Sequence, residues 1–112
     1  MFLDGLYEEF GLMMLSPESH RIPEMVKSVH LIAICGTAMG ALACMVKDQG
    51  YQVTGSDSKV YPPMSRFLEE KGVAVMAGYD QAHLLHRPDL VVIGNAVSRD
   101  NPEVVAVQEQ AL

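Results

Sequence analysis

From Val29 onward, short β-branched runs alternate with amphipathic helical stripes, and this alternation restricts the fold more than any other feature of the chain. The first run, residues 29–34, is rich in aliphatic residues, as expected of a strand buried on both faces of a parallel sheet. The predicted strands are residues 29–34, 52–55, 73–76 and 89–94, and the predicted helical segments lie at residues 39–49, 64–71, 81–85 and 101–111. The alternation predicts an α/β fold, a Rossmann-like parallel sheet of at least four strands with helices on both faces.

The apolar positions of these helical segments predict which residues enter the core. The first stripe has the spacing i, i+3, i+4 and i+7, and the later ones are shorter. The segment at 81–85 is the weakest and is expected to be a helical turn. The predicted core stripes are Met39, Leu42, Ala43 and Val46, then Met64, Phe67 and Leu68, and finally Val104, Val107 and Ala111.

The chain stops after a helical segment, where the next strand of such a sheet is due. We therefore expect a sheet that is truncated at its C-terminal end, in a chain that is the first part of a longer protein. Its 112 residues hold one domain at most, which we place at residues 29–112.

Residues 1–28 form a separate extension with five acidic and two basic residues. Phe2, Leu6 and Phe10 have helical spacing, whereas Pro17 and Pro23 are typical of a linker. The segment is interpreted either as a disordered extension or as a short helix docked on the body or on a partner. It lacks the basic start and the uninterrupted apolar run of a secretory signal. No apolar run approaches the roughly 20 residues that span a bilayer. We therefore expect a cytoplasmic protein without membrane insertion.

Composition excludes several classes of function. The net charge is −6, which argues against a nucleic-acid partner because nucleic acids require a basic face. Two cysteines cannot form a disulfide-rich scaffold. His83 and His86 could share a helical face, but no third ligand lies near them in the sequence, so no metal site is predicted.

The turn after the first strand, ICGTAMG at residues 34–40, is the strongest candidate for a binding site. In doubly wound sheets, ligands bind at the carboxyl ends of the strands. Small residues let backbone amides approach a diphosphate, and the N-terminus of the next helix adds partial positive charge. Asp57 follows the second strand, 21 residues after Gly36, where an acid accepts hydrogen bonds from a ribose. Because such an acid lies in a strand-end loop, we expect Asp57→Ala to weaken binding without unfolding the domain.

The dinucleotide fingerprint G-x-G-x-x-G is not intact in this turn. Its three glycine positions hold Ala33, Cys35 and Ala38. The residues alone therefore leave open both a phosphate-binding turn and a merely tight strand-to-helix turn, and NAD is the weaker choice of ligand.

Several other residues are interpreted as structural. Cys35 lies at a helix N-terminus, where a thiolate is stabilised, but we expect a packed thiol. His30 opens the first strand and is interpreted as a structural residue. Asp100 or Asn101 is expected to cap the last helix, with Pro102 in its first turn.

Four segments resemble the Mur ligases, which join amino acids or peptides to UDP-N-acetylmuramate using ATP. The resemblance covers residues 27–112 and is closer to the members that add a peptide than to those that add L-alanine. The segments are HLIAICGTAMGALA at 30–43, VTGSD at 53–57, VYPPMS at 60–65 and PDLVVIGNAVSRDNPEV at 88–104.

The resemblance implies that residues 29–112 are the N-terminal domain, which holds the UDP moiety of a UDP-N-acetylmuramate-type substrate. It places the diphosphate on the first turn, the uridine at the end of the second strand, and the phosphates or amino sugar after the fourth. The implied substrate-binding residues are Gly36, Thr37, Ala38, Met39, Gly40, Ser56, Asp57, Asn95 and Ala96.

The ATP-binding pattern G-x-x-x-x-G-K-[ST] does not occur in the chain. The resemblance therefore assigns ATP and Mg²⁺ to a missing domain of the same parent protein, and implies that this chain has no catalytic residue and no cofactor of its own. Three alternatives stay open: an NAD(H)-binding regulatory module, the N-terminal domain of an L-alanine-adding member of the family, and a degenerate sheet domain that serves only as an interaction surface.

Overall fold

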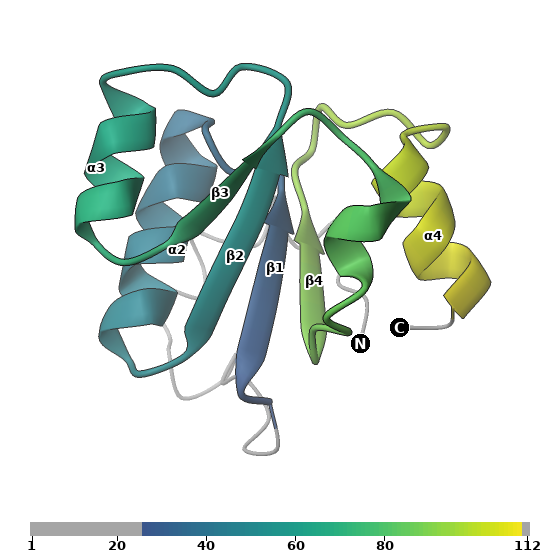
Figure 1. Ribbon diagram of the computed structural model, residues 1–112, viewed down its shortest axis with the longest axis horizontal. Helices are drawn as coiled ribbons and strands as arrows, with labels where there is room; N and C mark the ends of the chain where they lie inside the picture. Colours follow the sequence, from purple (N-terminus) through teal and green to yellow (C-terminus); the bar gives the residue numbers. More distant parts are fainter. Residues whose placement is uncertain (1–25, 111–112) are drawn as a thin grey trace.

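The computed structural model describes residues 26–110, which fold around one four-stranded sheet (Figure 1). All strand pairs are parallel, in the order β3-β2-β1-β4, so β3 and β4 form the two edges. The strands are β1 (Ser28–Ile32), β2 (Gln52–Asp57), β3 (Ala74–Ala77) and β4 (Leu90–Ile93). This order confirms the predicted parallel sheet with crossover connections.

Helices cover both faces of the sheet, as predicted. Two of them, α2 and α3, pack on one face, whereas η1 and α4 pack on the other (Figure 1). The helices are α2 (Thr37–Asp48), α3 (Met64–Glu70), the 3₁₀ turn η1 (Gln81–Leu84) and α4 (Pro102–Gln110). At the start of α4, Asn101 Oδ1 accepts the Glu103 N–H at 2.9 Å, which confirms the predicted cap. Within residues 26–110, none of the helices has the length and apolar character needed to cross a membrane.

The predicted stripe on α2 is confirmed, because Met39, Leu42, Ala43 and Val46 are all buried. The stripe on α3 was partly wrong: Leu68 is fully buried, but Phe67 is 45% exposed. The helix has only seven residues and lies over the edge of the sheet, where Leu68 is its buried residue and Met64 packs against the core from a partly buried position. In α4, Val104 and Val107 are buried as predicted. Ala111 and residues 1–25 lie outside the described residues.

The first strand ends two residues earlier than predicted, since the chain turns at Ala33. This residue has φ 76°, a left-handed conformation that only glycine adopts without cost. The turn then brings Ile34 back over the sheet, where it is fully buried beside Gly55 of β2. Ala33 therefore holds the first position of the incomplete fingerprint in the backbone geometry for which glycine is normally used.

We expect Ala33→Gly to stabilise the domain by about 0.5 kcal/mol. Removing the methyl group relieves the left-handed strain, which costs about 1–2 kcal/mol, while the greater backbone entropy of glycine in the unfolded chain offsets part of this gain. Urea denaturation monitored by circular dichroism measures the difference. A decrease in stability would show that the Ala33 methyl group contributes more by its packing near Gly94 than it costs in the backbone.

Candidate functional site

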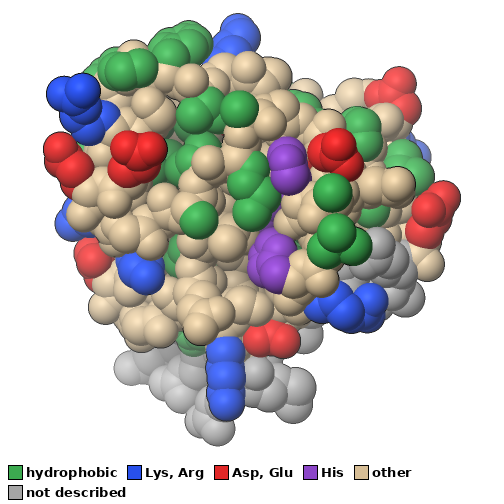
Figure 2. All heavy atoms as spheres, viewed as in Figure 1, with side chains coloured by type: hydrophobic (Ala, Val, Ile, Leu, Met, Phe, Trp, Pro, Cys, Tyr) green, Lys and Arg blue, Asp and Glu red, His purple; other side chains and the backbone are tan. Residues whose placement is uncertain are grey.

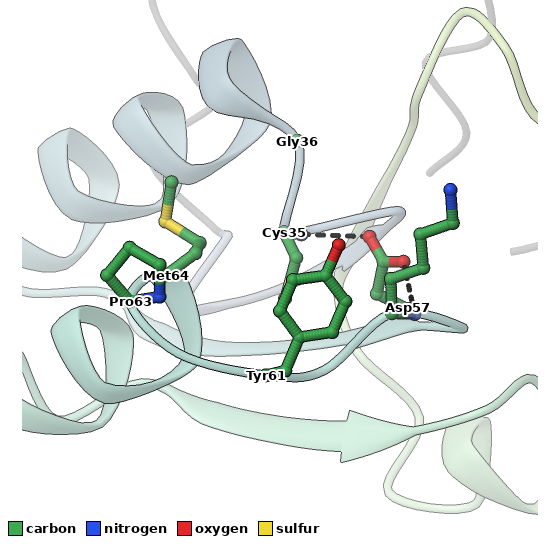
Figure 3. A pocket seen from close by; sticks show the side chains of 7 residues that line it. Cys35, Gly36, Asp57, Tyr61, Pro63 and Met64 are labelled. Atoms are coloured by element: carbon green, nitrogen blue, oxygen red, sulfur yellow. Dashed lines mark hydrogen bonds between the residues drawn. The ribbon is translucent and has the colours of Figure 1, made fainter.

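A pocket of about 200 Å³ lies at the carboxyl ends of β1 and β2 (Figure 3). Four segments line it: the β1–α2 turn, the last residue of β2, the β2–α3 loop and the first residue of α3. Its lining residues are Cys35, Gly36, Asp57, Lys59, Tyr61, Pro63 and Met64. The pocket therefore lies where parallel α/β sheets bind their ligands, and it includes two of the sequence-predicted residues.

Asp57 joins the two loops that flank this pocket. Its Oδ2 accepts the Cys35 N–H at 3.0 Å, and its Oδ1 accepts the Lys59 N–H at 2.9 Å. The residue is only 8% exposed. The premise that Asp57 is a loop acid with little packing to lose was therefore wrong, since Asp57 ends β2, is buried, and fixes the backbone on both sides of the pocket.

The N-terminus of α2 opens beside the pocket. Gly36 is the N-cap, with φ −67° and ψ 152°, and no side chain among residues 26–110 caps the helix. The amides of residues 37–39 have no partner within the helix, because the first hydrogen bond along it runs from Gly40 N–H to Gly36 O at 2.7 Å. No acidic residue lies in this first turn. The backbone thus presents unpaired donors and a positive dipole end to an anion.

The residues of the predicted cradle divide into two groups. Gly36 and Thr37 are exposed and Ala38 is half-buried, so their backbone lies at the surface. Met39 and Gly40 are buried, and a Cβ on Gly40 would lie 2.9 Å from Met64 Sδ. The absence of a side chain at Gly40 therefore lets α2 approach α3 closely.

Cys35 lines the pocket, and its surroundings disfavour the thiolate. Burial raises the pKa of its thiol, and the nearby Asp57 carboxylate raises it further. The interpretation of Cys35 as a packed thiol agrees with this environment.

Three other predicted residues do not line the pocket. Ser56 is fully buried, and its side chain points to the opposite face of the sheet, because neighbouring residues of a strand alternate. Its carbonyl oxygen nevertheless supports the turn, accepting the N–H groups of Ala33 at 2.8 Å and Ile34 at 3.1 Å. Asn95 and Ala96 are exposed just after β4, on the other side of β1 from β2.

Lys59 and Tyr61 complete the pocket and were missed from the sequence as site residues. Both are exposed, Tyr61 by 60%. Figure 3 shows the Tyr61 ring standing between Pro63 and Met64 on one side and Asp57 on the other, with its hydroxyl toward Cys35. The signal was present in the VYPPMS segment at 60–65, which carried the family resemblance but no predicted contact.

Comparison with known proteins shows to which family the chain belongs. The family model described as "Mur ligase family, catalytic domain" matches residues 28–112. The chain belongs to the Mur ligase family. The predicted resemblance is thereby confirmed over the whole described sheet.

Individual Mur ligases support the predicted subgroup. The chain is 52% identical over 87 residues to UDP-N-acetylmuramate--L-alanyl-gamma-D-glutamyl-meso-2,6-diaminoheptandioate ligase of Haemophilus influenzae. This alignment covers 78% of the chain and 19% of the Haemophilus protein. The chain is 40% identical over 93 residues to UDP-N-acetylmuramate--L-alanine ligase of a Psychrobacter species, covering 81% and 19%. The solved murein peptide ligase of Psychrobacter arcticus matches with a TM-score of 0.74 and 45% identity, over 77% of the chain and 18% of that structure.

These matches agree with the prediction that the peptide-adding members are more similar than the L-alanine-adding ones. They also show that the chain spans about a fifth of the length of the Mur ligases it matches. Among the residues that the structure describes, no group of three or more His, Cys, Asp or Glu side chains could hold a metal ion.

Proposed function

We propose that this Mur ligase chain holds the UDP moiety of UDP-N-acetylmuramate for an ATP-dependent muramyl ligase of cell-wall synthesis or recycling in the cytoplasm. The observation that carries the proposal is the pocket at the ends of β1 and β2, which lies directly beside the uncapped N-terminus of α2. An apolar recess next to a row of free amides suits a nucleotide, which combines a flat ring with an anionic diphosphate.

The pocket volume of about 200 Å³ fits one part of this ligand. Drug-sized ligands occupy about 300–1,000 Å³, so a whole nucleotide sugar does not fit inside. We assign the uracil ring to the pocket, where Tyr61, Pro63 and Met64 offer apolar surface. Of the polar side chains in the pocket, the Asp57 carboxylate can accept hydrogen bonds from the ribose, and the Lys59 ammonium group can bind the phosphates.

The strand order supports one direction for the rest of the proposed ligand. Because β1 lies between β2 and β4, the N-terminus of α2 separates the pocket from the loop after β4. A nucleotide sugar with its base beside β2 would cross the amides of residues 37–39 with its diphosphate. Its amino sugar would then reach Asn95 and Ala96, which are exposed at the end of β4.

The contribution of this chain to ligation would be orientation. It would fix the muramyl carboxylate in space for an ATP-binding domain elsewhere in the parent protein, and such positioning lowers the entropic part of a barrier. ATP and Mg²⁺ would bind to that other domain, since the chain has no G-x-x-x-x-G-K-[ST] pattern. We expect the chain by itself to bind and not to catalyse.

Isothermal titration of the 112-residue chain with UDP-N-acetylmuramate, UDP and NADH tests the proposal. We expect saturable one-to-one binding of the two uridine nucleotides and no competition from NADH. Tight NADH binding without a response to UDP would instead indicate a regulatory NAD(H) module. No binding of any of the three at millimolar concentration would indicate an interaction surface.

A single backbone donor can be removed to test the diphosphate position. We expect Thr37→Pro to weaken UDP binding at least about tenfold, because a hydrogen bond to a charged group contributes about 1.5–3 kcal/mol. Proline suits the first residue of a helix, and Gly36 already has the extended backbone that a following proline requires. Thr37→Ala is the matched control, since it removes the side chain but keeps the N–H. Equal affinities of the two variants in calorimetry would contradict the diphosphate assignment.

A further inference from the structure

A buried polar cluster lies on the sheet face opposite α2, under η1 and α4. At its centre is Glu103, the second residue of α4, whose side chain is fully buried. Glu103 Oε1 lies 2.8 Å from His30 Nε2, and Oε2 lies 2.8 Å from His83 Nδ1. The Asp80 N–H also donates to Oε2, at 3.2 Å. Figure 2 shows histidine side chains reaching the surface in the middle of this face.

The hydrogen bonds indicate that Glu103 carries its charge in the folded protein. Burial alone would raise the pKa of this carboxyl group, but hydrogen bonds from His30, His83 and Ser56 outweigh it and lower the pKa. An ionised carboxylate only accepts, so each of the two histidine nitrogens that face it carries a hydrogen. Charge-assisted bonds of this kind are short and direction-dependent, and they therefore fix the start of α4 against β1 and η1.

The cluster continues across β2 toward the surface. His30 Nδ1 lies 2.7 Å from Thr54 Oγ1, which in turn lies 3.2 Å from His86 Nε2. Every buried side-chain polar atom in residues 26–110 has a hydrogen-bond partner. A network that is fully satisfied in this way has one preferred arrangement, because moving one member leaves another unpaired.

Two segments connect this cluster to the candidate site at the carboxyl ends of the strands. The first is Ser56, whose Oγ lies 3.2 Å from His30 Nε2 and 3.1 Å from His83 Nδ1. The carbonyl oxygen of the same residue holds the amides of Ala33 and Ile34 in the β1–α2 turn. The neighbouring Asp57 holds the amide of Cys35. The cluster therefore lies directly behind the backbone that shapes the turn.

The second link is the loop between β4 and α4, residues 94–101. Its first residue, Gly94, donates its N–H to Ile32 O at 3.0 Å, at the end of β1. Its last residue, Asn101, caps α4 next to Glu103. Between these two fixed ends lie Asn95 and Ala96, both exposed. The position of the α4 start therefore sets the path of the loop.

We propose that Glu103 is a positioning residue for nucleotide-sugar binding. Through its hydrogen bonds to His30 and His83, it holds both the β1–α2 turn and the β4–α4 loop in the arrangement that binds the ligand. The inference rests on the proposed function, because it assumes a ligand that spans these two loops. Glu103 itself touches no ligand. Its effect on affinity passes through the backbone of the loops that it supports.

The variant Glu103→Gln tests this role with little change in volume. One carboxylate oxygen becomes an NH₂ group, which faces hydrogen-bond donors and cannot accept from them. We expect the affinity for UDP-N-acetylmuramate, measured by titration calorimetry at 10 °C, to fall about tenfold, as displaced contact groups typically cost this much or more. Amide hydrogen exchange in residues 94–101 should accelerate at least fivefold. Glu109→Gln is the matched control, since it removes the same charge from an exposed position on the same helix, and it should change neither quantity.

A second pair of variants separates positioning from general stability. His30→Gln keeps a side-chain N–H near the place of Nε2 and should retain affinity within about threefold, whereas His30→Leu should lose it as Glu103→Gln does. This pair also serves if Glu103→Gln fails to fold. Unchanged affinity in Glu103→Gln, or unchanged exchange of residues 94–101, would overturn the inference. If the wild-type chain binds no uridine nucleotide, the proposed function fails, and the exchange experiment alone decides whether Glu103 holds the loop.

Discussion

Replacing Gly55 by alanine should lower the free energy of unfolding by about 3 kcal/mol, which corresponds to a loss of about 15 °C in Tm for a domain of this size. Gly55 lies in the buried part of β2, and a Cβ there would be 2.3 Å from Ile34 Cδ1 and 2.6 Å from Ile34 Cβ. Both Ile34 atoms belong to a fully buried side chain, so neither can move aside cheaply. Thermal unfolding followed by circular dichroism measures the loss.

Two controls identify the cause. Gly36→Ala adds the same methyl group where its nearest neighbour is Ala33 O at 3.6 Å, and should cost about 1 kcal/mol, mostly as a weaker helix cap. Combining Gly55→Ala with Ile34→Ala should cost clearly less than the sum of the two single changes, since each side chain blocks the other. Additive costs would show that the collision with Ile34 is not responsible.

Removing the Asp57 carboxylate should have the largest effect on binding. We expect Asp57→Ala to weaken UDP binding by about a hundredfold, because the amides of Cys35 and Lys59 lose the group that aligns them beside the pocket. The same change should lower stability by about 2 kcal/mol, since two hydrogen bonds to a buried charge disappear. Titration calorimetry and urea denaturation measure the two effects separately.

Asp48→Ala is the control for charge, as it removes an exposed carboxylate from the far end of α2. It should leave UDP affinity within about twofold. The UDP affinity of Asp57→Asn should lie between those of Asp57→Ala and Asp48→Ala, because the single amide oxygen of asparagine can accept from only one of the two N–H groups. An Asp57→Ala protein that binds UDP as tightly as the wild type would remove Asp57 from the site.

The sequence alone was sufficient to predict where the pocket lies. The β1–α2 turn and the acid after β2 belong to consecutive elements of a parallel sheet, so the alternation of strands and helices is enough to bring them to one edge. The helix cap at Asn101 and the burial of the α2 stripe could also be predicted from the sequence. These features depend on spacing of a few residues and on general topology.

The remaining features depend on side-chain direction or on distant contacts. Ser56 precedes Asp57 in an extended strand and must face the other way, although the resemblance placed both near the uridine. Phe67 has helical spacing but is 45% exposed, because the seven-residue helix α3 covers only the edge of the sheet. Glu103 and His30 are 73 residues apart, and nothing local in either segment identifies the other as its partner. The fold had to be known before this cluster could be found.

The position of β4 at the margin of the sheet has a consequence for handling the protein. In the described part of the chain this strand pairs only with β1, so its outer row of amide and carbonyl groups has no neighbouring strand. The strand is Leu-Val-Val-Ile, without a charge or a proline that would discourage sheet extension. Its four residues are at most 4% exposed in the folded protein, so local unfolding that uncovers this margin would offer a template for edge-to-edge assembly, which a lysine introduced there would discourage.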